Sequence, residues 1–215
     1  MSEKNKATLY PLWSKPVYAK KLNFDTKKIV SKLEKYEFVE AGVEGENTAK
    51  DILSATKNLN VLDDKVFKYL KKMLIDEFHL FINEHMKYTN EFKITTSWFN
   101  KNLKGQPSNW HNHNNSMYSA VLYLQTDENS GKISFYNFSN QRFALSVTDY
   151  NILNCENWKI NPIDGMLLIF PSEMYHRIEE NESNIVRYSL AFNFLPTGLL
   201  GRTDADSHAK INIEK

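Results

Sequence analysis

The sequence lacks the features that would assign it to several large classes of protein. Its 215 residues include a single cysteine, Cys155, which excludes an internal disulfide framework and favours a reducing compartment. With 27 basic and 26 acidic residues the net charge is +1, so charge indicates neither a nucleic-acid nor an anionic-membrane partner. No stretch approaches the roughly 20 apolar residues of a membrane-spanning helix, and the polar N-terminal residues predict no signal sequence. We therefore expect one cytoplasmic domain over residues 1–215.

Two amphipathic helices are predicted in the first half of the chain. Asp25 has the side chain of an N-cap, and the apolar residues after it, Ile29, Val30, Leu33 and Tyr36, recur at helical spacing and predict a short helix that ends before Gly42. The second and clearer helix begins at Asp63 or Asp64 and continues to about His85, with one apolar face along its whole length. This face should cover a β-sheet.

From Phe92 onward the hydrophobic period changes to that of β-strands. The predicted strands are 93–100, 117–126, 132–138, 166–170 and 185–194. We expect a hairpin connection at 129–131, Asn-Ser-Gly, and a tight turn at 162–165, Pro-Ile-Asp-Gly. Earlier in the chain, 10–24 contains two prolines and predicts an edge strand or an extended lead-in, and 44–60 is predicted to be a loop, with a turn of helix as the alternative.

The order of these elements predicts the fold class. Helical support over 25–88 precedes a β core over 92–196, and a polar, loosely ordered tail follows at 201–215. Helices followed by many short strands indicate a mainly β domain with flanking N-terminal helices (α+β), built as a helix-backed antiparallel sandwich or jelly roll.

A pair of histidines suggests a metal site. His111 and His113 precede a predicted strand, and alternate side chains of an extended chain project to the same side, so both imidazoles can reach one ion. A third ligand is expected from His176, which follows the strand at 166–170. Three neutral nitrogen ligands leave open positions for dioxygen and a substrate, and imidazole suits iron, zinc or copper. Asn115 is an alternative ligand, because a carboxylate at its position would complete a two-histidine, one-carboxylate triad.

Arg187 lies within an apolar strand that has no acidic residue to pair with it. A buried arginine is costly unless its charge is paired, and a bound carboxylate could provide the partner. The guanidinium would hold it through two parallel hydrogen bonds, and Ser189, facing the same way, could add a third. The alternative is an exposed arginine, or an ion pair with Glu179, Glu180 or Glu182.

Four segments together resemble a known family. They are 97–100 (Ser-Trp-Phe-Asn), 111–124 (beginning His-Asn-His), 165–177 (ending Tyr-His-Arg) and 187–194 (beginning Arg-Tyr-Ser). In order and spacing they resemble the 2-oxoglutarate- and iron(II)-dependent oxygenases, prolyl-hydroxylase-like proteins frequent in marine bacteriophages and bacteria. The stretch 12–18 is similar to the family's opening strand, so the resemblance covers nearly the whole chain except an insertion at about 140–159.

The resemblance implies a double-stranded β-helix with iron(II) at its mouth. Its position gives His176 the role of the distal ligand, with His111 and His113, or Asn115, completing the set. The co-substrate 2-oxoglutarate would chelate the metal, and Arg187 would bind its far carboxylate. The other candidate site residues are Ser189 and Tyr123 for the co-substrate, and Trp98 and Asn100 for the substrate.

The function predicted from these residues is oxidation of the hydroxylase type, which consumes 2-oxoglutarate and yields succinate and CO2. The substrate would be a small molecule or a protein side chain, selected by loops at 42–60, 100–110 and 140–159. Neither nucleic acid nor membrane is an expected partner, and a phage-encoded protein would act in the host cytoplasm. Two alternatives remain open: a three-histidine, cupin-type dioxygenase without 2-oxoglutarate, in which Arg187 binds the substrate's own carboxylate, and a non-catalytic phage protein that keeps the fold.

Overall fold

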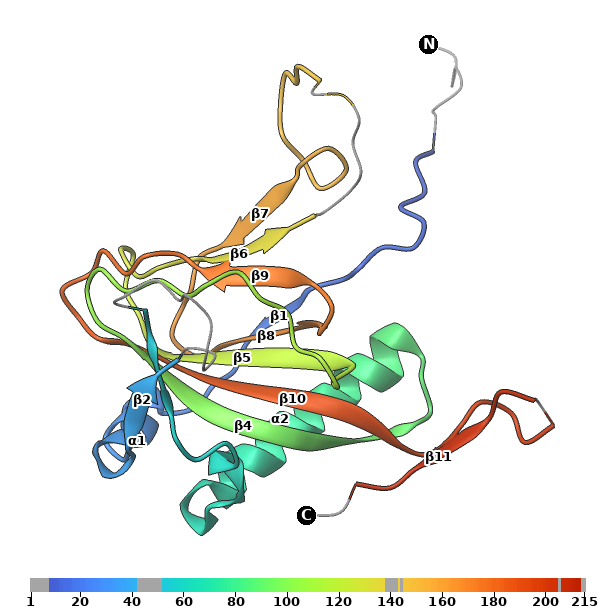
Figure 1. The fold of residues 1–215 in the computed structure, drawn as a ribbon, viewed down its shortest axis with the longest axis horizontal. Coiled ribbons are helices and arrows are strands. Elements are labelled where there is room, and N and C mark those ends of the chain that lie inside the picture. Colours follow the sequence, from blue (N-terminus) through green and yellow to red (C-terminus); the bar gives the residue numbers. More distant parts are fainter. Residues whose placement is uncertain (1–7, 42–51, 138–142, 144, 205, 214–215) are drawn as a thin grey trace.

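The structure is a computed structural model that describes residues 8–41, 52–137, 143, 145–204 and 206–213. Its strands form two sheets (Figure 1). The strand order is β1-β8-β5-β10-β4-β3-β2 in the larger, eight-stranded sheet, where β11 also pairs with β10, and β7-β6-β9 in the smaller sheet. The smaller sheet lies over one face of the larger sheet, and helix α2 lies against the other. This is the predicted mainly β jelly roll.

The elements have the following bounds. The helices are α1 (Thr26–Val30) and α2 (Lys68–Leu80), with short helical turns at Leu33–Lys35, Val61–Asp63, Lys65–Phe67 and Phe81–Met86. The strands are β1 (Tyr18–Lys21), β2 (Phe38–Glu40), β3 (Ser54–Thr56), β4 (Glu91–Asn102), β5 (Tyr118–Gln125), β6 (Ile133–Tyr136), β7 (Asn157–Ile160), β8 (Met166–Pro171), β9 (Tyr175–Ile178), β10 (Arg187–Leu200) and β11 (Ala209–Ile211).

The two faces of the larger sheet form two separate parts of the core, because side chains alternate along each strand. Leu190, Phe192 and Phe194 of β10 face α2, where the ring of Phe194 stacks on Phe78 with 3.5 Å between centroids. The opposite face meets the smaller sheet, and there Tyr123 of β5 packs in a second apolar cluster. Polar side chains on this inner face therefore lie between the two sheets.

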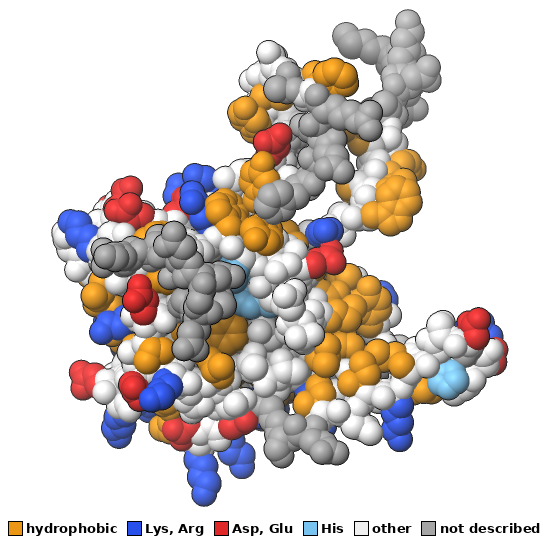
Figure 2. Space-filling model, viewed as in Figure 1, with side chains coloured by type: hydrophobic (Ala, Val, Ile, Leu, Met, Phe, Trp, Pro, Cys, Tyr) orange, Lys and Arg blue, Asp and Glu red, His pale blue; other side chains and the backbone are white. Residues whose placement is uncertain are grey.

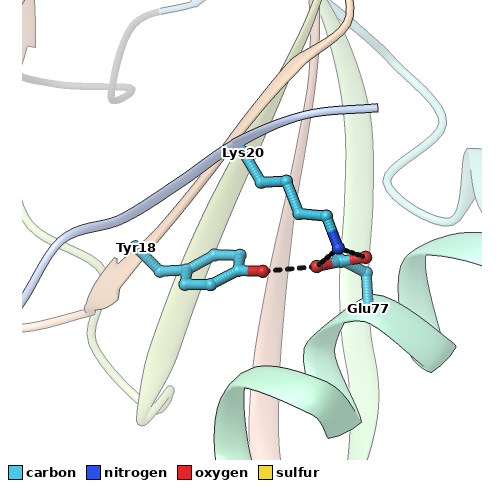
Figure 3. Close-up of polar contacts among 3 residues, drawn as sticks. All are labelled: Tyr18, Lys20 and Glu77. Atoms are coloured by element: carbon cyan, nitrogen blue, oxygen red, sulfur yellow. Dashed lines mark hydrogen bonds and ion pairs between the residues drawn. The ribbon is translucent and has the colours of Figure 1, made fainter. Parts of the chain in front are cut away.

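The edge strand β1 is held to α2 by a polar contact (Figure 3). Tyr18 donates its hydroxyl to Glu77 Oε1 at 2.5 Å, and Lys20 Nζ lies 2.8 Å from each carboxylate oxygen of Glu77. The predicted lead-in is thus an edge strand over its last part, where β1 pairs with β8. Because β1 contacts both β8 and α2, it connects the sheet to the helix that covers it.

The structure corrects three sequence predictions. The predicted loop 44–60 contains a strand, β3, which pairs with β2 (Phe38–Glu40), whereas the first helix ends at Val30, before Gly42 as predicted. The turn at 129–131 does not close a hairpin, because β5 pairs with β8 and β10 whereas β6 pairs with β7 and β9. This turn carries the chain from one sheet to the other.

The third correction concerns the tail, in which Ala209–Ile211 forms β11 and pairs with β10. The second helix, the turn at Gly165 and the five main strands are confirmed. The sequence did not predict β7 and β9. Residues 42–51, and residues 140–142 and 144 of the insertion at 140–159, lie outside the described residues. The last part of the insertion forms β7. In the described part of the chain no helix is long and apolar enough to cross a membrane.

Candidate metal centre and anion site

Three histidines that are distant in sequence come together between the sheets. His111, His113 and His176 each offer a ring nitrogen, and these ligand atoms all lie within 4.8 Å of one another. The ring centroids are 4.4 Å apart for His111 and His176, 5.1 Å for His111 and His113, and 5.2 Å for His113 and His176. The structure thus brings together the three predicted histidines, and one ion can contact all of them.

Backbone pairing produces this convergence. His111 and His176 form an antiparallel bridge, in which each amide donates to the other's carbonyl at 2.8 and 2.9 Å. The amide of His113 donates to the carbonyl of Ser172 at 3.0 Å, in the turn that joins β8 to β9. Main-chain hydrogen bonds thus hold both segments that carry the imidazoles.

Hydrogen bonds also fix the tautomers of two of the rings. His111 Nδ1 lies 2.8 Å from the carbonyl oxygen of Asn109, and His176 Nδ1 lies 2.8 Å from that of Met174. A carbonyl can only accept, so each Nδ1 carries the proton and each Nε2 keeps its lone pair. These are the second contacts expected of metal-binding histidines.

The electrostatics of the cluster suit a cation. Burial lowers the pKa of His111, His113 and His176 below the ordinary value, and that of His113 falls to about 4. All three rings are therefore uncharged at neutral pH, which is the form that binds metals. Asn115, the alternative ligand, is exposed in a turn with φ of 57° and does not line the cavity described below.

Arg187 lies deeper between the sheets and is fully buried, with 0% of its surface exposed. Its Nη1 donates to Asn102 Oδ1 at 3.2 Å and to Ser189 Oγ at 3.4 Å, and both acceptors are uncharged. Neither Nε nor Nη2 makes a hydrogen bond of standard geometry to the described residues. Glu179 contacts Lys159 instead, at 2.5 Å. The alternative of an exposed or Glu-paired arginine is therefore wrong.

A second polar group lies beside this guanidinium. The buried hydroxyl of Tyr123 interacts with Arg187 but makes no hydrogen bond of standard geometry to the described residues, and the Tyr123 ring centroid is 5.1 Å from Arg187 Cζ. Burial raises the pKa of Tyr123 to about 12, so the hydroxyl keeps its proton and can donate. Buried polar groups are almost always hydrogen-bonded, so a buried guanidinium with two donors left over, next to a phenol that can donate, is suited to an anionic ligand.

The histidines line a cavity of about 440 Å³ between the sheets. Trp98 and Asn100 of β4 lie on its wall, with Trp98 Nε1 donating to Asn100 Oδ1 at 3.0 Å and the Trp98 ring 5.6 Å from that of His113. Ser189 also lines the cavity, so Arg187 is one side-chain contact from it. Histidine surface is visible near the centre of the face in Figure 2, beside hydrophobic side chains.

The sequence analysis missed two residues next to Arg187, Asn102 and Asn181. With Arg187, Ser189 and Tyr123 they form the candidate anion site. Both asparagines are fully buried, and Asn181 Nδ2 donates to the backbone carbonyl of Asn102 at 3.1 Å. A signal was available for Asn102, because Trp98, Asn100 and Asn102 alternate along β4 and face the same side. No local pattern marks Asn181, whose contact with Asn102 joins residues 79 positions apart.

This arrangement has the donor set for an oxygenase: a neutral metal-binding cluster, an open cavity and a buried cation nearby. Residues 96–193, which include all these histidines and Arg187, match the profile of the family described as "Putative 2OG-Fe(II) oxygenase". Over this stretch, which is a little under half of its length, the chain is similar to that family. It is an oxidoreductase with iron and 2-oxoglutarate as cofactors.

Solved structures share the fold at low sequence identity. A prolyl-4-hydroxylase from Pseudomonas putida is 19% identical, with a TM-score of 0.57 over 87% of this chain and 96% of that one. A prolyl hydroxylase from Trichoplax adhaerens, in complex with a peptide fragment of hypoxia inducible factor, is 15% identical, with a TM-score of 0.60 over 83% and 82%.

HygX from Streptomyces hygroscopicus, with nickel, 2-oxoglutarate and hygromycin B bound, is 13% identical, with a TM-score of 0.59 over 84% of this chain and 83% of that one. These likenesses support the double-stranded β-helix. No curated protein sequence matches the chain.

Proposed function

We propose that this oxygenase hydroxylates an unactivated carbon of a small molecule or a protein side chain, with iron(II) held by His111, His113 and His176. The observation that carries the proposal is the convergence of three neutral imidazoles, with ligand atoms within 4.8 Å, on the wall of one cavity. Oxidation of the substrate, coupled to decarboxylation of 2-oxoglutarate to succinate and CO2, is the chemistry that bound iron supplies there. The exposed position of Asn115 favours the histidine set.

Arg187 is the proposed partner of the far carboxylate of 2-oxoglutarate. Its Nε and Nη2 lie along one edge of the planar guanidinium and present parallel N–H bonds, which match the two oxygens of a carboxylate. The Tyr123 hydroxyl is positioned to donate a further hydrogen bond, and Ser189 connects the guanidinium to the cavity wall. A carboxylate bound there would accept hydrogen bonds from Nε and Nη2 of Arg187 and from the Tyr123 hydroxyl.

Trp98 and Asn100 are the proposed substrate contacts. The indole N–H occupies the Asn100 carbonyl oxygen, so the Asn100 amide nitrogen is free to donate to an acceptor on the substrate. The indole ring, next to His113, would limit how the substrate enters beside the metal.

The proposed location is the cytoplasm, of a host cell if the protein is phage-encoded. The single cysteine supports a reducing compartment, and the phage origin rests on the sequence resemblance alone.

Anaerobic titration of the iron-loaded protein with 2-oxoglutarate tests the co-substrate. Binding is expected, followed by succinate formation when oxygen and a correct substrate are added. A metal-loaded protein that binds no 2-oxoglutarate would support the three-histidine dioxygenase instead. A substrate screen that measures succinate would then identify the substrate class.

A further inference from the structure

Among the three nitrogens of the Arg187 guanidinium, only Nη1 makes hydrogen bonds of standard geometry within the described chain, and Asn102 is one of its two acceptors. Asn102 lies directly opposite Arg187 in the pairing of β4 with β10. Its Oδ1 accepts from Nη1 of Arg187, so the contact uses one corner of the guanidinium and leaves the Nε–Nη2 edge without such a bond. An arginine has five N–H donors; Nε and Nη2 carry three of them, and two of these point in parallel from this edge.

The orientation of the Asn102 amide is fixed by its other contacts. Asn102 Nδ2 donates to the backbone carbonyl of Gln106 at 3.3 Å, which leaves Oδ1 to face Arg187. The side-chain Oε1 of Gln106 accepts a hydrogen bond from the Leu103 amide at 2.9 Å, and this contact closes the turn after β4. If the Asn102 amide were flipped, its NH2 group would face the N–H groups of Arg187, and its oxygen would face the carbonyl oxygen of Gln106. Only the observed orientation satisfies both contacts.

Asn181 secures this turn from the loop that follows β9. Its backbone carbonyl accepts from the Gly105 amide at 2.8 Å, and its Nδ2 donates to the carbonyls of Asn102 and Ile185, at 3.1 and 3.2 Å. The turn after β4 is therefore connected to the segment just before Arg187. Both ends of the Asn102–Arg187 contact are held by buried hydrogen bonds.

We propose that Asn102 is a positioning residue for 2-oxoglutarate: it orients Arg187 through an uncharged acceptor and leaves the charge and the Nε–Nη2 edge for the carboxylate of the co-substrate. This inference rests on the proposed role of Arg187. An aspartate at position 102 could accept the same hydrogen bond from Arg187, but its carboxylate would also form an ion pair with the guanidinium and neutralise its charge. The neutrality of Asn102 is thus what keeps the candidate anion site available.

The test compares Asn102→Asp, Asn102→Ala and the parent, each as the full chain loaded with nickel(II), by calorimetric titration with 2-oxoglutarate. Asn102→Asp should raise the Kd for 2-oxoglutarate at least about tenfold, because an internal ion pair competes with the ligand. Asn102→Ala should raise it by a smaller factor, about threefold, because the guanidinium loses its orienting contact but keeps its charge. Nickel affinity should be unchanged in both variants.

Asn193→Asp is the matched control. Asn193 is a buried asparagine on the same face of β10, and it lies six residues from Arg187, roughly 20 Å along the strand. This variant introduces the same buried carboxylate without contact to the guanidinium. Its Kd for 2-oxoglutarate should stay within about twofold of the parent value, because the charge is too distant to pair with Arg187.

The possible outcomes are distinct. If Asn102 only stabilises the fold, both Asn102 variants lower the melting temperature and leave the Kd unchanged, which overturns the proposal. If Asn102→Asp does not fold, as judged by circular dichroism, Asn102→Ala decides by the same criterion. A parent protein that binds nickel but no 2-oxoglutarate refutes the proposed co-substrate. A parent that binds, with Asn102→Asp binding equally well, refutes only the role of Asn102.

Discussion

Single residues at this site are informative because several polar atoms make no hydrogen bond of standard geometry within the described chain. Two of these atoms are nitrogens of Arg187, which is fully buried, and another is the hydroxyl oxygen of Tyr123 beside it. Burying an ion costs several kcal/mol unless its surroundings compensate. A chain that keeps such groups at the edge of a cavity is organised for a ligand that pairs them, and substitutions here should change binding more than folding.

Arg187→Ala should abolish 2-oxoglutarate binding and leave metal binding nearly intact. The loss should be at least about 2 kcal/mol, or roughly thirtyfold in Kd, because a two-pronged, charge-assisted contact is removed. Arg187→Lys should restore little, since an ammonium cannot reproduce the fork. Anaerobic calorimetry measures both. If the two variants bind 2-oxoglutarate as tightly as the parent, Arg187 is structural and the co-substrate site lies elsewhere.

His176→Ala should weaken metal binding by more than about 100-fold, because even the loss of groups that only support a ligand costs 10–100-fold. His176 is the most buried of the three histidines, with 4% exposed, and its Nδ1 is already bonded to Met174. His79→Ala, on helix α2 outside the cluster, is the control and should bind metal like the parent. Competition with a chelating dye reports both affinities. Equal affinities would exclude His176 from the site.

Among the structural elements, the connection from β5 to β6 constrains the site most closely. It crosses from the larger sheet to the smaller one, and Gly131 there lies against the segment after β9. A Cβ atom at Gly131 would stand 2.0 Å from the backbone oxygen of Glu179. Because the nearest atom belongs to the backbone of Glu179 and not to a flexible side chain, it cannot move aside easily, and the close packing requires glycine at position 131. The strand that carries His176 ends one residue before the contact.

Gly131→Ala should therefore destabilise the fold by about 1–3 kcal/mol, the range for overpacking, and should also weaken metal binding by displacing β9. Gly198→Ala is the control. Gly198 has φ of 82° but no atom within 4 Å of a built Cβ, so strain alone should cost about 1–2 kcal/mol and metal affinity should not change. Urea unfolding and metal titration measure the two effects. Unaltered metal affinity in Gly131→Ala would show that β9 adjusts without moving His176.

At the scale of the whole molecule, the core does not depend on the metal. One apolar cluster fills the space between the larger sheet and α2, and another fills the space between the sheets. The bridge between His111 and His176 is made by main-chain hydrogen bonds, which need no ion. The metal-free protein should consequently be folded, and its cavity should already have the shape that the ligands require.

Removal of metal with a chelator should leave the far-ultraviolet circular dichroism spectrum unchanged. Added metal should raise the unfolding free energy only by mass action, about 2.7 kcal/mol at a free concentration 100 times the Kd. Thermal unfolding with chelator, and at several metal concentrations, measures this term. Unfolding on chelation would identify a structural metal and contradict the proposed catalytic role.

The sequence by itself determined the local patterns and the unusual residues. Apolar patterns of strand length identified β4, β5, β6, β8 and β10, because a strand buried on one face alternates and one buried on both faces is a short continuous apolar run. His111, His113 and His176 were identifiable because they are potential ligands at strand ends. Arg187 was identifiable because a charge in an apolar strand needs compensation wherever the strand lies.

Only the tertiary structure decided which segments pair. The turn after β5 has the residues of a hairpin, yet β5 is buried on both faces within the larger sheet and its partners are distant strands. The predicted loop 44–60 contains β3 for the same reason, because a three-residue strand is formed by its pairing with β2 and β4 and has no pattern of its own. The contact of Asn102 with Arg187 joins residues 85 positions apart and depends on the register of β4 with β10, which no local sequence encodes.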